Sequence, residues 1–67
     1  MRLVQKHYPG YEPANAEHVE RMEKFMSGAE TKEELATASV LYIFDMTYAR
    51  QDIATVVSAI ERERGWR

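Results

Sequence analysis

The stretch from residue 31 to residue 64, TKEELATASVLYIFDMTYARQDIATVVSAIERER, decides how this chain folds. It contains neither glycine nor proline, and it opens with a capping box in which the side chains of Thr31 and Glu34 can each accept a hydrogen bond from a backbone amide. These features predict helix throughout the stretch. Because a globular helix usually spans about 8–20 residues, the stretch forms either two helices or one unusually long helix.

The spacing of apolar residues fits both arrangements. A line of positions from Leu35 to Ile60 alternates steps of four and three residues, as in a coiled-coil seam. We favour a break at residues 45–48, because Thr47 and Tyr48 are weak helix formers. A hairpin at this point would also let a short chain bury its own apolar surface.

Two alternatives stay open for this stretch. One helix over residues 31–64 would be about 50 Å long, from the rise per residue of an α-helix, and it would need a partner helix in a helical dimer. A strand over residues 40–44, Val-Leu-Tyr-Ile-Phe, fits their high strand propensity. The capping box ahead of these residues and the lack of turn residues behind them make the strand the least favoured.

Residues before this stretch indicate the remaining elements. Asn15 is a good N-cap and Gly28 is a natural stop for a first helix. Both prolines lie within the first 14 residues and predict irregular structure there. We therefore predict an all-α fold in a single domain, residues 1–67: a three-helix unit with helices at about residues 15–27, 31–46 and 49–64, and an irregular N-terminal arm at residues 1–14.

Composition and charge limit the classes of function. The chain has 67 residues, no cysteine and a net charge of −2, and neither half carries the basic stripe typical of nucleic-acid binders. It lacks a run of 18 apolar residues, so we expect no membrane span. The first residues lack the apolar stretch of a signal peptide, so we expect a cytoplasmic protein. Neither nucleic acid nor a membrane is an expected partner.

The sequence carries no common catalytic or ligand-binding motif. The three glycines are isolated, which excludes a glycine-rich phosphate loop, and no serine lies in a Gly-x-Ser-x-Gly elbow. The two histidines, His7 and His18, are too few for a structural zinc site without carboxylates. We therefore expect no catalytic residue, no metal site and no cofactor, and we do not expect an enzyme.

The middle predicted helix has apolar residues on two faces. At 100° per residue, Leu35, Ala38, Tyr42, Met46 and Ala49 share one side. A second apolar group lies on nearly the opposite side, and it consists of Val40, Leu41, Phe44 and Tyr48. Either the other two helices cover both faces, or the second group contacts another molecule. We favour the second option and expect an interface with a protein partner or, in a homodimer, with a second copy.

Acidic residues are concentrated in the first half of the chain. Six of them form a possible acidic face, and they are Glu17, Glu20, Glu23, Glu30, Glu33 and Glu34. If the fold gathers these side chains on one side, they could mimic a nucleic acid and compete for a basic groove. Such binding should weaken steeply as salt concentration rises.

These features favour a non-enzymatic protein-binding module that acts as an adaptor or a stoichiometric inhibitor of a larger partner. Small, acidic, cysteine-free helical proteins are common among phage-encoded modulators such as anti-CRISPR proteins, although no motif in this chain points to a named family. The alternative is a small dimeric transcription regulator of the helix-turn-helix type, built on residues 51–62. The usual turn glycine is missing there, and the acidic and basic residues nearly balance.

Overall fold

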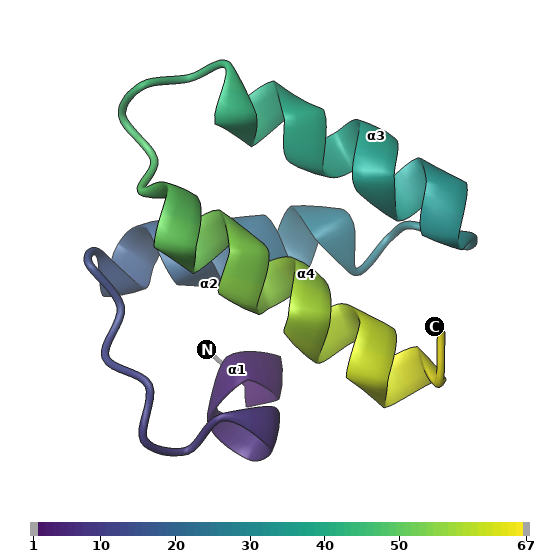
Figure 1. The fold of residues 1–67 in the computed structure, drawn as a ribbon, viewed down its shortest axis with the longest axis horizontal. Coiled ribbons are helices and arrows are strands. Elements are labelled where there is room, and N and C mark those ends of the chain that lie inside the picture. Colours follow the sequence, from purple (N-terminus) through teal and green to yellow (C-terminus); the bar gives the residue numbers. More distant parts are fainter. Residues whose placement is uncertain (1, 67) are drawn as a thin grey trace.

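A computed structural model of the chain describes residues 2–66, and within this range all regular structure is helical (Figure 1). The predicted all-α unit with three longer helices is confirmed. The alternatives of one continuous helix over residues 31–64 and of a strand over residues 40–44 are wrong. In chain order, the helices are α1 (Arg2–His7), α2 (Ala16–Met26), α3 (Lys32–Ile43) and α4 (Arg50–Arg64).

The last helix, α4, forms the centre of the fold. The helices α1, α2 and α3 each pack against it, and α2 also contacts α3 (Figure 1). The α4 side chains Ile53, Val56, Ala59 and Ile60 are buried at spacings of three, three and one, and they form one stripe of the core. The rest of the buried apolar core comes from Val4, Val19, Met22, Met26, Ala29 and Leu35. The fold therefore buries the last helix, and the middle helix α3 lies at the outside.

The N-terminal arm is more regular than the sequence suggested. Its first residues form the short helix α1, in which Val4 is fully buried against the core. A six-residue helix is too short to be stable alone, so tertiary contacts must hold it. One such contact is the hydrogen bond from the Val4 amide to Glu23 Oε1 of α2, at 2.7 Å. The remainder of the arm is irregular, as predicted.

Side-chain caps start α2 and α3 where the sequence places them. Asn15 Oδ1 accepts a hydrogen bond from the His18 amide at 3.2 Å, and Thr31 Oγ1 accepts one from the Glu34 amide at 3.1 Å. The Glu34 carboxylate reaches back to the Glu30 amide, one residue earlier than in a standard capping box. These local hydrogen bonds explain why both helix starts are readable from the sequence.

The break between α3 and α4 begins earlier than predicted, because α3 ends at Ile43 rather than at residue 46. After it, the Asp45 carboxylate accepts a hydrogen bond from the Thr47 amide at 2.9 Å, which forms a tight local turn. This hydrogen bond with Thr47 is also the main cause that lowers the pKa of Asp45. At the other end of α4, Gly65 caps the helix in the left-handed conformation, with φ of 71°.

Candidate functional site

The most unusual surface of the molecule is an exposed apolar patch at the C-terminal end of α3. Within it, Phe44 is 80% exposed, Met46 is 91% exposed and Leu41 is 61% exposed. Large apolar side chains of a small protein are rarely left in water in a group. We call this group the α3 apolar surface, and it consists of Val40, Leu41, Ile43, Phe44 and Met46.

The position of α3 in the fold explains this exposure. Its apolar residues are spread around the whole helix, whereas α2 and α4 cover it from one side only (Figure 1). Leu35 and Ser39 lie on the covered side and are buried. Val40 and Phe44 are turned away from this side by the pitch of the helix. No segment among residues 2–66 covers that outer side.

Three of the four residues predicted for the interface lie on this surface, but Tyr48 does not. Its ring packs against His18 and Tyr42, with ring centroids 4.4 and 4.8 Å away, and its hydroxyl accepts a hydrogen bond from Arg21 at 3.0 Å. The prediction assumed a helix through residue 48. Because α3 ends at Ile43, its angular register does not extend to Tyr48, which instead closes the edge between α2 and α3.

The early end of α3 also explains the position of Met46. The sequence predicted that Met46 shares one side of the middle helix with Leu35 and Tyr42, but in the structure it is exposed to solvent. Met46 lies in the connection after α3 and has the largest exposed fraction of the exposed large apolar residues. Tyr42, by contrast, lies on the covered side together with Leu35, as predicted. The rings of Tyr42 and Phe25 pack edge-on there, with their centroids 5.9 Å apart. Burial is the main cause that raises the pKa of Tyr42, and the neighbouring Tyr48 adds to it.

The six acidic residues predicted as a face are divided by the fold. Glu23 is buried between α2 and α1 and accepts the Val4 amide, so it is not part of an exposed face. Glu17 lies in the first turn of α2. The remaining side chains lie elsewhere along α2 and at the start of α3, and they are Glu20, Glu30, Glu33 and Glu34. Glu23 could have been noticed in the sequence, because it lies within the apolar stripe of its helix.

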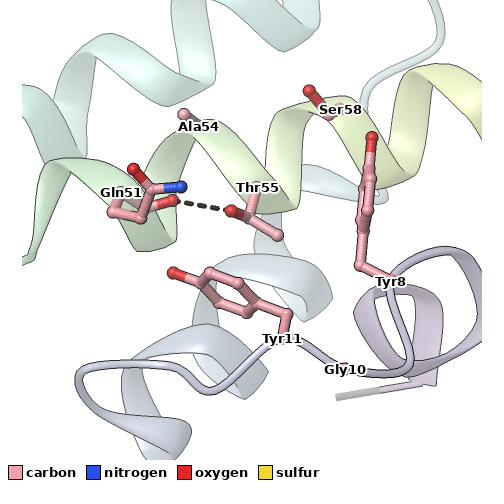
Figure 2. Close-up of a pocket in the computed structure, with 7 residues that line it drawn as sticks. All are labelled: Tyr8, Gly10, Tyr11, Gln51, Ala54, Thr55 and Ser58. Atoms are coloured by element: carbon pink, nitrogen blue, oxygen red, sulfur yellow. Dashed lines mark hydrogen bonds between the residues drawn. The ribbon is translucent and has the colours of Figure 1, made fainter.

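A shallow groove of about 490 Å³ separates the arm from α4 (Figure 2). The rings of Tyr8 and Tyr11 form one wall, and α4 forms the other. The α4 wall is lined by Gln51, Ala54, Thr55 and Ser58. The Thr55 hydroxyl donates a hydrogen bond to the Gln51 carbonyl oxygen at 2.8 Å. The side chains that line the groove are uncharged at neutral pH.

The carboxylate of Asp52 lies behind this groove and fixes the arm to α4. It is fully buried and accepts hydrogen bonds from the Tyr11 hydroxyl at 2.5 Å and from the amides of Ala14 and Asn15 at 3.0 and 3.1 Å. Burial first, and then this hydrogen bond, raise the pKa of Tyr11. These three hydrogen bonds join residues 11–15 to the first turn of α4. No local pattern indicates the pairing of Tyr11 with Asp52, because the two residues are 41 positions apart in the chain.

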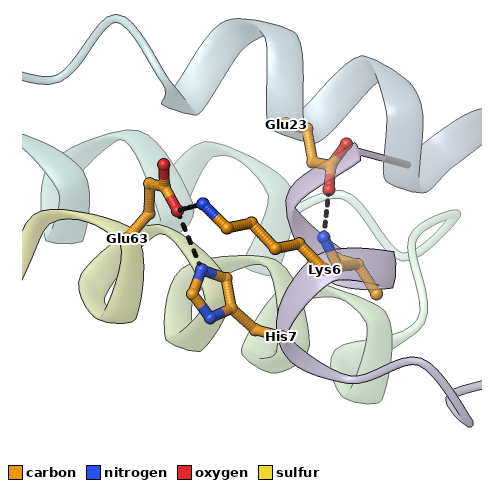
Figure 3. A network of polar contacts seen from close by, with 5 residues as sticks. Lys6, His7, Glu23 and Glu63 are labelled. Carbon is orange, nitrogen blue, oxygen red and sulfur yellow. Dashed lines mark hydrogen bonds and ion pairs between the residues drawn. The ribbon is translucent and has the colours of Figure 1, made fainter.

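A second polar cluster joins α1 to the end of α4 (Figure 3). Lys6 Nζ lies 2.7 Å from Glu63 Oε1, and His7 Nε2 lies 3.0 Å from the same oxygen. Lys6 first, and then His7, lower the pKa of the Glu63 carboxyl. Arg64 extends the set of contacts at this end of α4 by donating to the carbonyl oxygens of Ser27 and Ala29. These contacts join α1 and the C-terminal end of α2 to the end of α4.

Neither polar cluster is a candidate metal centre, because no three His, Asp or Glu side chains of the described residues lie together as ligands. Residues 51–62, considered above as a helix-turn-helix, lie within the single helix α4. No helix in the described range is both long enough and apolar enough to cross a bilayer. Comparisons with models of protein families, with curated proteins and with solved structures found no match.

Proposed function

We propose that this chain is a non-enzymatic protein-binding module that docks through the α3 apolar surface. One observation carries the proposal: Leu41, Phe44 and Met46 are large apolar side chains within a stretch of six residues, and they are between 61% and 91% exposed. Exposed apolar groups mark interaction sites, and aromatic and methionine side chains are enriched in protein–protein interfaces. The polar clusters elsewhere in the molecule are engaged in holding its helices together.

The size of the apolar gain supports docking to a protein groove. Full burial of a Leu, Phe or Met side chain contributes about 1.5–3 kcal/mol, so the three most exposed residues supply a substantial part of a specific interaction. A module this small that offers one such surface can act by occupying a surface on a larger protein. It would therefore serve as an adaptor or as a stoichiometric inhibitor.

Site-specific photocrosslinking in cells of the source organism tests this proposal. A photoreactive phenylalanine analogue at position 44 should crosslink to one larger protein. The same analogue at Gln5, an exposed position on α1, is the matched control and should not give that product. Adding Leu41→Ala to the position-44 variant should reduce the yield. A product that forms equally from both positions, or no larger product from position 44, would contradict docking through this surface.

The salt dependence of the captured complex separates apolar docking from charge mimicry. An interface centred on Leu41 and Phe44 should keep most of its affinity between 50 mM and 500 mM salt. Binding through the exposed glutamates should weaken steeply over the same range, because salt screens interactions between exposed charges. A steep loss would move the docking site away from the α3 apolar surface.

A further inference from the structure

A second groove, of about 350 Å³, lies between α3 and α4, and we call it the α3–α4 groove. Its walls come from these two helices, and its lining residues are Ser39, Ile43, Arg50, Ile53, Ala54, Val57 and Ser58. The five α4 residues are spaced by three, one, three and one, which places them along one side of the helix. Along the axis of α4, the two ends of this row are about 12 Å apart.

The middle of the α3–α4 groove is apolar. Ile53 is buried and Val57 is half-buried, so both lie deep in the groove, whereas the side chain of Ile43 is exposed at its edge. The buried Ser39 adds no free donor, because its hydroxyl donates to the Ala36 carbonyl oxygen at 2.7 Å. Alkyl groups of a ligand would therefore meet apolar side chains over most of the length of the groove.

One end of the groove is positively charged. Arg50 is exposed and is the one charged residue among those that line the groove. Within residues 2–66, no carboxylate lies within ion-pair distance of its guanidinium. The aspartates nearest to it in the chain have other partners: Asp45 accepts the Thr47 amide, and the buried Asp52 accepts the Tyr11 hydroxyl. The charge of Arg50 is thus available to an anionic ligand.

An apolar groove with a cation at one end is complementary to a carboxylate that carries an alkyl chain. A guanidinium matches the geometry of a carboxylate, with which it forms charge-assisted hydrogen bonds. A peptide in the same place would press its backbone amides against Ile43, Ile53 and Val57, where they would find no hydrogen-bond partner, and this is costly. The volume of about 350 Å³ lies at the lower end of the range for small-molecule sites.

We infer that the α3–α4 groove binds a small carboxylate of the medium-chain fatty acid class, with its carboxylate at Arg50 and its alkyl chain along Ile43 and Val57. This site is additional to the proposed protein-docking function, because neither Leu41 nor Phe44 lines the groove. Since the two walls belong to different helices, a ligand that binds only the folded chain also stabilises the packing of α3 on α4.

Titration of the isotope-labelled full chain with decanoate, followed by NMR, tests this inference. The amide signals of Ile43, Arg50 and Val57 should shift and reach saturation. We expect a dissociation constant of about 1 mM or lower, which burial of about five CH₂ groups provides. Decylamine, which has the same chain and the opposite charge, should bind more weakly. No saturation at 5 mM decanoate would overturn the inference, and so would equal binding of decylamine.

Two variants at the groove test the position of the ligand. Arg50→Gln should weaken decanoate binding about fivefold, as for an exposed ion pair, and should leave the binding of neutral decanol unchanged. Ala54→Glu, which adds a negative charge at an exposed position of the groove, should weaken decanoate at least as much. Arg2→Gln is the matched control, because it removes an exposed arginine on α1.

Three results would contradict this assignment. Equal losses in Arg50→Gln and Arg2→Gln would mean that decanoate responds to the overall charge of the protein. Unchanged affinity in both groove variants, with helix content intact by circular dichroism, would place the ligand elsewhere. Shifts confined to the amides of Leu41 and Phe44 would assign decanoate to the α3 apolar surface. The crosslink from position 44 is measured without decanoate, so it tests the proposed function independently of this site.

Discussion

Single buried carboxylates connect parts of this molecule that are distant in the sequence. Asp52 joins residues 11–15 to the first turn of α4, and Glu23 joins α2 to α1. Asp52 accepts two backbone amides and Glu23 accepts one, and burying such a group without a partner is costly. These two residues therefore determine where the arm lies, although the arm itself contributes few residues to the core.

Replacing Asp52 by asparagine should destabilise the protein. The amide keeps one oxygen acceptor but puts a donor group against the donors of Tyr11, Ala14 or Asn15. Hydrogen bonds to a charged group contribute about 1.5–3 kcal/mol each to stability, so we expect a loss of about 2–3 kcal/mol in urea denaturation. Tyr11→Phe, which removes only one of the donors, should cost less. Equal losses of stability for the two variants would show that the loss comes from the Tyr11 hydrogen bond alone and not from the amides of Ala14 and Asn15.

The contacts of Glu63 make stability depend on pH. Because Lys6 and His7 lower the folded-state pKa of Glu63 below its ordinary value of 4.5, the contribution of this carboxylate is complete above that value. It is lost as the pH falls through the folded-state pKa. Glu63→Gln should therefore lower the melting temperature at pH 7, and the difference from wild type should vanish in strong acid. A difference that stays constant from pH 7 to pH 2 would show that the loss is not electrostatic.

At the scale of helices, local signals were readable from the sequence and long-range ones were not. The starts of α2 and α3 follow from Asn15 and Thr31, because a capping side chain contacts an amide only three residues away. The end of α3 does not follow in this way. It accompanies the packing of Tyr48 on His18, 30 positions apart in the chain, and no local pattern records such a contact. The same reason explains why the helix α1 was missed.

The C-terminal cap of α4 makes a specific prediction. Gly65 has φ of 71°, and its amide and that of Trp66 donate to the carbonyls of Arg62 and Glu61. A residue with a Cβ atom is strained in this conformation, so Gly65→Ala should lower the free energy of unfolding by about 1 kcal/mol. Gly10→Ala is the control, because Gly10 has open space for a Cβ atom and no positive φ. Equal effects of the two substitutions would argue against strain at the cap.

Considered as a whole, the described residues form a small core built around α4, and the α3 apolar surface lies outside this core. The exposure of Val40, Leu41 and Phe44 could be anticipated, because α3 has apolar residues on two faces and a short chain has few helices to cover both. The sequence did not reveal that α4 is the central helix. Its apolar stripe resembles that of an ordinary surface helix, whereas its burial also includes Asp52 and Thr55, which are polar residues.

Substitutions inside and outside the core should therefore have very different effects. Ile60 is 1% exposed, and replacing a buried isoleucine by alanine costs about 2–5 kcal/mol. A domain of this size rarely has more than about 3–5 kcal/mol of stability, so Ile60→Ala should be largely unfolded at 37 °C. Leu41→Ala removes a side chain of equal size that is 61% exposed. At low micromolar protein concentration, the melting temperature of Leu41→Ala should differ little from that of wild type. Comparable losses of stability in Ile60→Ala and Leu41→Ala would contradict the distinction between core and exposed apolar residues.

The central position of α4 also affects when the chain can fold during translation. The helices α1, α2 and α3 all leave the ribosome before the helix on which they pack. At a synthesis rate of roughly 5–20 residues per second, they wait about a second or more for α4, with the α3 apolar surface and the future core both uncovered. The nascent chain thus presents more apolar surface to chaperones than the mature protein does, and its folding is decided only when the last helix emerges.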